Sequence, residues 1–237
     1  MGESIIGVSY STGRQATPRR LAVLYDFDRG RRLMGSLSYD IKLKRRQKMT
    51  VKDSGCNGVE RLKEGNRRYL QVKNEIGDIS PAVRRDTCVN GQKPFALIIT
   101  CSDSRVIPEA IFQVGIGDLF VIRIAGNVID NHQLGSIEYA ADHLGVKLIV
   151  VLGHTHCGAV DAAISHNPEG YIRFITDEIK EAIGDTNDPY EASCRNVRHS
   201  IEAIEASKII RHDEEEGLQV LGAVYDIETG EVHFLNR

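Results

Sequence analysis

Three side chains that bind soft metals stand at two separate places in the sequence. Cys101 directly follows the apolar run 95–100, and His154 and Cys157 follow the apolar run 147–152. Residues just past the carboxyl ends of parallel strands gather in one crevice of an open sheet, so these distant positions can meet. Two sulfurs and one imidazole make a three-ligand zinc site whose fourth position is left for water or substrate. Two other interpretations stay open: a strand-ending histidine beside a buried cysteine, and His156 as the nitrogen ligand.

The residues after Cys101 add a second chemical group. Asp103 and Arg105 follow the cysteine at intervals of two in the segment CSDSR. A guanidinium has forked donors that match a carboxylate, so this pair would keep the acid ionised and oriented. Such a pair can also be an ordinary exposed ion pair without a functional role. Its place beside a candidate metal ligand favours a catalytic role.

The elements that must position these residues alternate along the chain. Short apolar runs predict buried strands at 95–100, 119–125 and 147–152, and residues 107–115 and 132–145 predict helices between them. Residues 58–72 and 189–210 carry apolar stripes at helical spacing, and a loop runs through Asp78, Ser80 and Pro81. Residues 218–235 alternate, turn and alternate again, which indicates a hairpin. The expected fold is α/β, with a short, mostly parallel sheet flanked by helices and a C-terminal hairpin strand.

Composition and charge narrow the class of protein. Of 237 residues, 41% are hydrophobic and 27% charged, which is typical of a globular chain that can bury a sizeable core. Residues 1–48 hold 11 Lys and Arg against 4 Asp and Glu, whereas residues 49–237 hold 19 against 29. We therefore expect a basic N-terminal arm, which is not a domain of its own, and one domain over residues 49–237. Base-stacking aromatics on a fixed face do not accompany the basic residues, so no nucleic-acid partner is expected.

No membrane association is expected either, because no apolar run is long enough to cross a bilayer and the first residues do not resemble a secretion signal. Five cysteines at irregular spacing predict reduced thiols and a cytoplasmic protein, not a disulfide framework.

The motifs CSDSR at 101–105 and HTHCG at 154–158 resemble the signature of the β-class carbonic anhydrases, C-x-D-x-R followed some fifty residues later by H-x-x-C. The resemblance covers nearly all of the chain after Met49, including residues 64–69, 92–105, 136–160 and 224–235. It implies a dimer or a multiple of one. It also implies zinc held by Cys101, His154 and Cys157, a catalytic dyad of Asp103 and Arg105, and substrate contacts from Gln92, Phe120, Tyr139 and Gly158.

Those substrate contacts carry qualifications. Phe120 and Tyr139 are expected to reach the pocket across the dimer interface, whereas a tight turn also explains Gly158. Ile124 replaces the asparagine that usually stands in the loop after the second strand, so the hydrogen bonding of that loop is an open question.

The resemblance implies reversible hydration of carbon dioxide to bicarbonate, in which a zinc-bound hydroxide attacks CO2 and the Asp103–Arg105 dyad orients it. Two thiolates and a neutral imidazole cancel the charge of zinc, so the pKa of the bound water should lie at or above about 7 and activity should rise toward alkaline pH. Asp103 has an alternative role as a fourth zinc ligand that closes the site. Two alternative functions remain: a related zinc hydrolase of carbon disulfide or carbonyl sulfide, and a zinc protein without catalysis.

Overall fold

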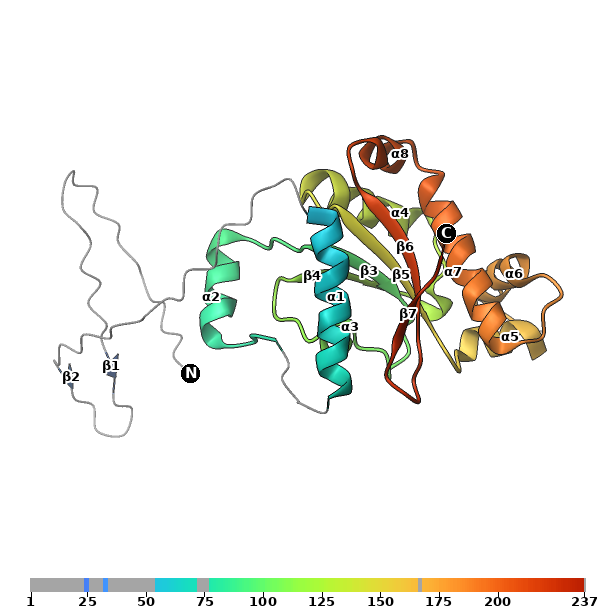
Figure 1. The fold of residues 1–237 in the computed structure, drawn as a ribbon, viewed down its shortest axis with the longest axis horizontal. Helices are drawn as coiled ribbons and strands as arrows, with labels where there is room; N and C mark the ends of the chain where they lie inside the picture. The colour runs from blue at the N-terminus through green and yellow to red at the C-terminus, as the bar shows by residue number, and fades with distance from the viewer. Residues whose placement is uncertain (1–23, 26–31, 34–53, 72–76, 166–167, 237) are drawn as a thin grey trace, which may run out of the picture. The chain divides into compact units, whose positions relative to one another are not determined.

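The computed structural model of the chain describes residues 24–25, 32–33, 54–71, 77–165 and 168–236 (Figure 1). The chain divides into two units, residues 1–48 and residues 49–237, and each is described by itself. In the first unit, two short strands, β1 (Leu24–Tyr25) and β2 (Arg32–Leu33), pair antiparallel. The rest of the predicted basic arm lies outside the described residues, so its role stays a prediction.

The second unit is built on a five-stranded sheet with the order β4-β3-β5-β6-β7. Neighbouring strands are parallel from β4 to β6, and only β7 runs antiparallel, beside β6. The predicted mostly parallel sheet with a C-terminal hairpin strand is confirmed. The strands are β3 (Ala96–Thr100), β4 (Leu119–Arg123), β5 (Leu148–His154), β6 (Gln219–Tyr225) and β7 (Val232–Phe234).

The two central strands are buried on both faces. Every residue of β3 and β5 is buried, and successive residues enter different core clusters. Ile98 packs with Phe112 and Leu62 on one face, whereas Ile99 packs with Val197 on the other. Burying one such side chain contributes about 1.5–3 kcal/mol. The carboxyl ends of β3 and β5, where the predicted metal ligands stand, are therefore held by a rigid core.

Helices cover both faces of this sheet (Figure 1). α1 (Ser54–Leu70) contributes Leu62 to one face, together with residues that follow α3 (Pro108–Ile111). The other face is covered by α4 (Asn131–Glu138), α7 (Pro189–Glu205) and α8 (Lys208–Glu215). α5 (Gly158–Ser165) and α6 (Ile172–Ile183) pack on a third cluster that includes Cys101 and Cys157. α2 (Pro81–Asn90) precedes the first strand of the sheet.

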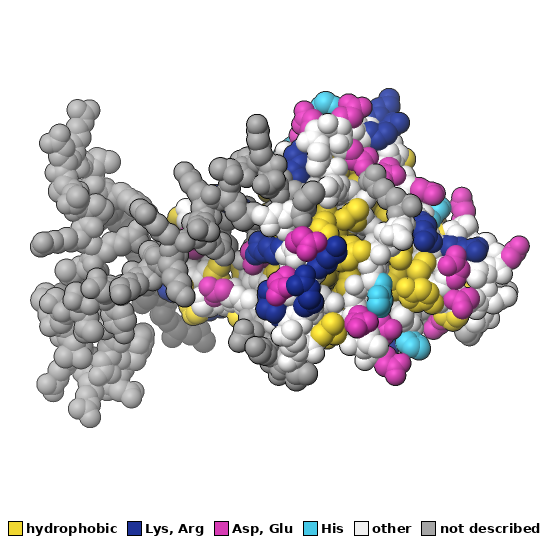
Figure 2. Space-filling view, in the orientation of Figure 1, with side chains coloured by type: hydrophobic (Ala, Val, Ile, Leu, Met, Phe, Trp, Pro, Cys, Tyr) yellow, Lys and Arg dark blue, Asp and Glu magenta, His cyan; other side chains and the backbone are white. Residues whose placement is uncertain are grey.

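The exposed face of α1 is covered by charged side chains of both signs (Figure 2). Glu60 pairs with Lys63, and Glu64 pairs with Arg67, each one helical turn apart. Such exposed pairs contribute about 0.2–0.5 kcal/mol each, so they support the helix only modestly. This face of α1 is a solvated surface.

Two predicted helices are shorter or less regular than expected. The helix predicted at 107–115 is reduced to the four residues of α3, because Gln113 adopts a left-handed φ of 49° shortly after it. The helix predicted at 132–145 is α4 followed by a π-helical turn, η3 (Tyr139–His143).

Three other boundaries differ from the predictions. The helix predicted at 189–210 breaks at Ala206, where Ser207 accepts hydrogen bonds from the amides of Ile209 and Ile210 and starts α8. The predicted loop ends at Ser80, because Pro81 is the first residue of α2. β5 extends to His154, so this histidine ends the strand and does not follow it.

Among the described residues, no helix combines the length and the apolar character that crossing a membrane requires.

Candidate metal centre

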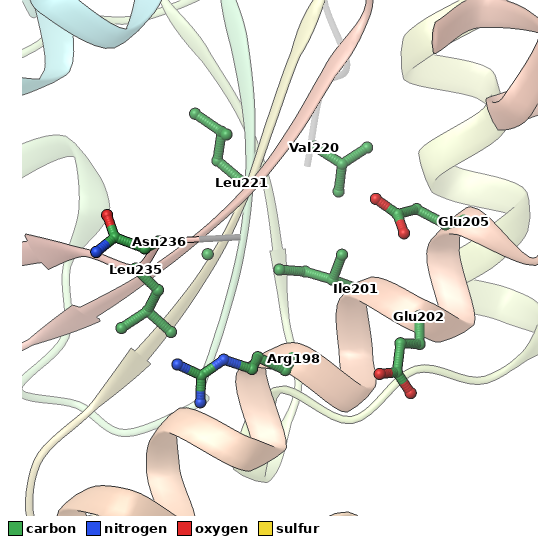
Figure 3. Close-up of a pocket in the computed structure, with 9 residues that line it drawn as sticks. Arg198, Ile201, Glu202, Glu205, Val220, Leu221, Leu235 and Asn236 are labelled. Atoms are coloured by element: carbon green, nitrogen blue, oxygen red, sulfur yellow. The ribbon is translucent and has the colours of Figure 1, made fainter.

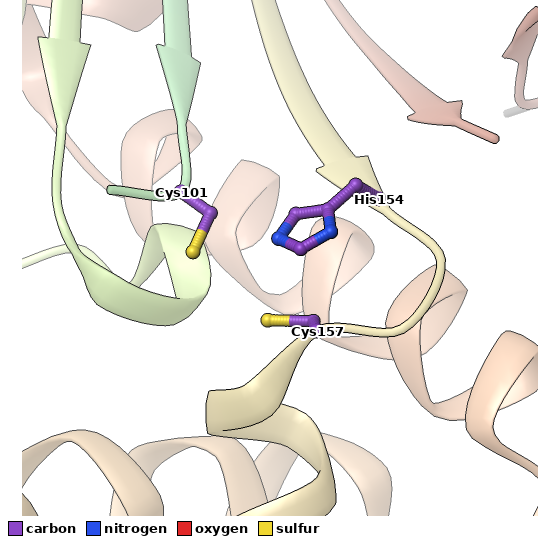
Figure 4. A group of neighbouring side chains, drawn as sticks. All are labelled: Cys101, His154 and Cys157. Atoms are coloured by element: carbon purple, nitrogen blue, oxygen red, sulfur yellow. The ribbon is translucent and has the colours of Figure 1, made fainter. Parts of the chain in front are cut away.

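Cys101, His154 and Cys157 converge at the carboxyl edge of the sheet (Figure 4). β3 and β5 are neighbours, with Thr100 opposite Leu152, so Cys101 and His154 leave adjacent strand ends. A turn at His156, with a φ of 54°, brings Cys157 back toward them. One ligand atom from each residue lies within 4.8 Å of the others, and all three residues are buried. The structure thus brings together the three predicted ligands from two distant segments.

The donor atoms of this group fit zinc. The Nδ1 atom of His154 lies 2.8 Å from the Thr155 carbonyl oxygen and donates to it, which leaves Nε2 unprotonated as the ligand atom. Nε2 is buried and has no hydrogen-bond partner. A buried polar atom without a partner is costly, and a metal ion would satisfy it. Two sulfurs and one such nitrogen are the ligand types that zinc prefers.

The Cys101 sulfur receives hydrogen bonds from several directions. The thiol of Cys157 donates to it, and this bond is the main reason that the pKa of Cys101 falls to about 4. The backbone N–H of Gly126, 3.3 Å from the sulfur, lowers this pKa further, whereas burial opposes it. These hydrogen bonds favour the thiolate form of Cys101, which is the form that binds metals.

Cys157 immediately precedes the first residue of α5. The backbone amides of Val160 and Ala159 lower the pKa of Cys157, as expected for a sulfur at a helix N-terminus. Its hydrogen bond to the Cys101 thiolate and its burial act more strongly and raise that pKa above the ordinary value. The two sulfurs thus share one proton, which metal binding would release.

The predicted pair of Asp103 and Arg105 is formed next to this group. Oδ1 of Asp103 accepts hydrogen bonds from Nε and the backbone N–H of Arg105, both at 2.9 Å, and Oδ2 accepts one from Nη2 at 2.7 Å. These bonds hold the pKa of Asp103 well below its usual range, and the carboxylate raises the pKa of Arg105. The same Nη2 also donates to the carbonyl oxygen of His156 at 3.0 Å, which links the pair to the turn between His154 and Cys157.

The predicted substrate residues lie at different places in this chain. Phe120 and Tyr139 approach each other, with ring centroids 6.2 Å apart, at the edge strand β4 and the turn η3. Phe120 packs on the cluster that contains Ile99, and not on the cluster that contains Cys101. Gln92 is exposed beyond α2, and Gly158 is exposed at the start of α5. Their predicted roles in substrate binding remain predictions.

Ile124 fits the loop after β4 without disturbing its backbone. Its N–H donates to the Thr100 carbonyl oxygen at 3.1 Å, and its own carbonyl accepts from Asn127 at 3.0 Å. The side chain packs on the cluster that contains Cys101 and Cys157. The apolar substitution therefore adds packing next to the metal group.

Several residues that support the centre were not predicted from the sequence. Arg123 donates to the backbone oxygens of Cys101 and Asp103, at 3.3 Å and 2.6 Å. Thr155 accepts the N–H of Ile227 on Oγ1 at 3.0 Å, which ties the turn after β5 to the C-terminal hairpin. Arg123 could have been noticed as the one charged residue inside the apolar run 119–125. Thr155 gives no such signal, because its partner is 72 positions away.

A separate surface cavity of about 290 Å³ lies between α7 and β6 (Figure 3). Its floor is apolar, with Ile201, Val220 and Leu235, and charged side chains such as Arg198 and Glu202 stand at its rim. It includes no member of the metal group, so the chemistry of the centre does not use it.

Fold and site together define an α/β metalloprotein with a two-cysteine, one-histidine centre at the carboxyl ends of parallel strands. A family model for carbonic anhydrase matches residues 96–232, which is more than half of the chain. The chain belongs to this family, and its solved relatives place it in the β class, whose members use zinc.

Similar proteins agree with this assignment. Carbonic anhydrase 2 of Mycobacterium tuberculosis is 46% identical over 127 residues, covering 52% of this chain and 61% of the relative. The carbonic anhydrase of Pseudomonas aeruginosa is 36% identical over 171 residues, covering 61% of this chain and 74% of the relative. The chain thus spans about three fifths of the length of the mycobacterial relative.

Solved structures give the same result for the fold. The β-carbonic anhydrase CcaA superposes with a TM-score of 0.59 at 28% identity, over 76% of this chain and 95% of that one. A β-carbonic anhydrase from Sordaria macrospora, described as tetrameric, also has a TM-score of 0.59, at 27% identity and with 76% and 98% coverage.

Proposed function

We propose that this protein catalyses the reversible hydration of carbon dioxide to bicarbonate and a proton. The observation that carries the proposal is the convergence of Cys101, His154 and Cys157 beside the ionised Asp103. A zinc ion held by these ligands would lower the pKa of a water molecule toward about 7 and so supply a nucleophile at neutral pH.

Asp103 is suited to orient that nucleophile. Its Oδ1 already accepts two hydrogen bonds from Arg105, whereas the described contacts of Oδ2 include one. A carboxylate oxygen has about two acceptor positions, so Oδ2 has one left for a hydrogen of the attacking water. Arg105 keeps the Asp103 carboxylate ionised and in place. Its hydrogen bond to the His156 carbonyl oxygen fixes the pair relative to the turn between His154 and Cys157.

The remaining parts of the proposal concern substrate and assembly. We assign Gln92, Phe120, Tyr139 and Gly158 to the binding of CO2 and bicarbonate, with Phe120 and Tyr139 acting in the pocket of a second copy. The exposed Tyr139 at the sheet edge supports this assignment, because 45% of its surface is open to a partner. A homodimer or homotetramer in the cytoplasm completes the proposal, and the tetrameric Sordaria relative supports self-association.

Stopped-flow CO2 hydration across pH tests the function. We expect Asp103→Ala to lower kcat/KM by about 10²–10⁴-fold, because a positioned proton acceptor typically contributes that much. Asp185→Ala, which removes an exposed carboxylate between α6 and α7, is the matched control and should leave the rate unchanged. The wild type should become more active toward alkaline pH, since two thiolates reduce the acidifying effect of zinc.

Two results would contradict the proposal. Equal rates for wild type and Asp103→Ala would remove Asp103 from the mechanism. A zinc-loaded wild type that fails to hydrate CO2 would leave either hydrolysis of carbon disulfide or carbonyl sulfide, tested with those substrates, or a zinc protein without catalysis.

A further inference from the structure

Helix α7 buries a row of polar side chains against the metal edge of the sheet. Ser193, Asn196 and Ser200 lie at successive turns of the helix and are 3%, 1% and 2% exposed. A polar group buried this deeply is costly unless it is hydrogen-bonded. Asn196 and Ser200 donate to backbone carbonyls outside the helix, whereas the single hydroxyl hydrogen of Ser193 is shared between Pro189 of the same helix and a carbonyl outside it.

The acceptors outside the helix belong to the backbone around the metal ligands. Nδ2 of Asn196 donates to the Gly126 carbonyl oxygen at 2.7 Å, and Oγ of Ser200 donates to that of Asn127 at 2.9 Å. Ser193 reaches the carbonyl oxygen of His154 at 3.3 Å. Helix α7 thus contacts the backbone of the ligand His154 and the turn at Gly126 and Asn127, which adjoins the ligand Cys101.

The turn that α7 holds has an unfavourable backbone conformation. Gly126 and Asn127 adopt φ values of 67° and 47° in succession. Left-handed backbone suits glycine and is tolerated by asparagine at some cost, so at Asn127 it needs support from its surroundings. Asn196 and Ser200 supply this support, because they bind the two consecutive carbonyl oxygens of the turn.

This conformation places an N–H group on a metal ligand. The Gly126 N–H donates to the Cys101 sulfur at 3.3 Å, from the same residue whose carbonyl oxygen accepts from Asn196. A hydrogen bond to a thiolate withdraws charge from the sulfur and fixes its position, and such outer contacts tune metal sites.

Packing alone does not explain why the buried position 196 is occupied by an asparagine and not by an apolar residue. Its Oδ1 atom is buried and has no hydrogen-bond partner among the described residues. An apolar side chain of similar size would avoid this cost, so the contribution of Asn196 lies in its donor end.

We propose that Asn196, assisted by Ser200, is a positioning residue that holds the Gly126 N–H on the Cys101 sulfur and so sets the donor strength of this thiolate toward the metal. The inference rests on the metal site and not on the reaction that the protein catalyses. Asn196 acts through Gly126 and touches neither metal nor substrate.

The test uses the full chain loaded with Co²⁺ in place of zinc, because the sulfur-to-cobalt charge-transfer band reports the donor strength of the thiolates. Asn196→Leu keeps the branched shape of the side chain and removes the donor. We expect the band to shift to longer wavelength, because a thiolate that loses an N–H donor holds its electrons less tightly. We also expect zinc affinity, measured by competition with a chelator, to fall about tenfold, because the Cys101 sulfur is no longer fixed in position and this loss outweighs its greater donor strength.

Two further variants make the outcome decisive. Ser200→Ala removes the bonds of Oγ to the Asn127 carbonyl and side-chain amide, together with its bond to the Asn196 carbonyl within the helix. It should shift the band in the same direction, which keeps the test valid if Asn196→Leu does not fold. Cys194→Ala trims another buried side chain of α7, 3% exposed, and should leave band and affinity unchanged. The proposal is wrong if Asn196→Leu and Ser200→Ala leave the band at its wild-type position, or if Cys194→Ala shifts it equally. A failure of CO2 hydration would leave this result untouched.

Discussion

Replacing Gly126 by alanine should destabilise the protein more than the same substitution at an exposed glycine that also has a left-handed backbone. A Cβ atom at Gly126 would lie 2.7 Å from Cδ1 of Ile179 and 3.1 Å from Cβ of Ala159. Ile179 is fully buried, so its side chain has little room to move away. Overpacking of this kind costs about 1–3 kcal/mol. The left-handed φ of 67° adds about 1–2 kcal/mol for an alanine.

Gly145 is the matched control for the backbone contribution. Its φ of 68° is nearly the same, and a Cβ there meets no atom within 4 Å. Gly145→Ala should therefore cost only the left-handed contribution of about 1–2 kcal/mol. Alanine also lowers the conformational entropy of the unfolded chain, which offsets part of the stability loss by a similar amount in both variants. This contribution therefore cancels when the two variants are compared.

Thermal unfolding at one fixed protein concentration measures the difference. At about 2–4 °C per kcal/mol for a domain of this size, Gly126→Ala should lower Tm by roughly 4–20 °C and Gly145→Ala by roughly 2–8 °C. Fixed concentration matters because self-association contributes to apparent stability. If the two variants lose the same stability, the close packing of Ile179 and Ala159 on this turn does not matter and the reasoning is refuted.

Two further predictions concern the charged pair and the N-terminal arm. Arg105→Gln removes the guanidinium whose hydrogen bonds are the main reason for the depressed pKa of Asp103, so the pKa of this carboxyl should rise toward its ordinary value. A carboxyl group whose pKa is lower in the folded than in the unfolded state stabilises the fold above its unfolded-state pKa. This contribution is lost as the pH falls. Urea unfolding of the metal-free proteins should show that wild type has a larger free energy of unfolding than Arg105→Gln, with the full difference at pH 7 and a smaller one below about pH 4. A difference in unfolding free energy that does not vary with pH would argue against a stabilising Asp103–Arg105 pair. Deleting residues 1–48 should leave the CO2 hydration rate unchanged, and a large loss in stopped-flow assays would give the arm a role in the reaction.

The sequence predicts the sheet well, and it predicts the convergence of Cys101, His154 and Cys157, for a physical reason. Buried parallel strands must be apolar on both faces, so runs such as 95–100 and 147–152 stand out from amphipathic helices. Cys101 and His154 stand at or just past the ends of these runs, which is why the sequence alone places them at one edge of the sheet.

Helix boundaries were predicted less well. Ser80 and Pro81 form an N-cap and first-turn signal, and the Ser80 Oγ accepts the Val83 amide at 3.4 Å, yet the segment was interpreted as a loop. Ser207 is a similar cap signal at the start of α8. Both signals are present in the sequence. The π-helical turn at Tyr139–His143 has none, because its spacing depends on packing against the sheet.

The residues around the metal ligands could not be predicted from the sequence. Asn196 and Ser200 look like ordinary polar positions of an amphipathic helix, and their partners Gly126 and Asn127 are 70 and 73 positions away. Only the folded chain shows that these polar groups are buried and directed at one turn. Contacts of this kind depend on three-dimensional packing and leave no local pattern.

The central claim is that Cys101, His154 and Cys157 bind one zinc ion, and X-ray absorption at the zinc edge of the purified protein tests it most directly. The account predicts one zinc per chain, with two sulfur neighbours at about 2.3 Å and nitrogen or oxygen neighbours at about 2.0 Å. Protein without zinc, or a zinc spectrum with no sulfur neighbours, would contradict it.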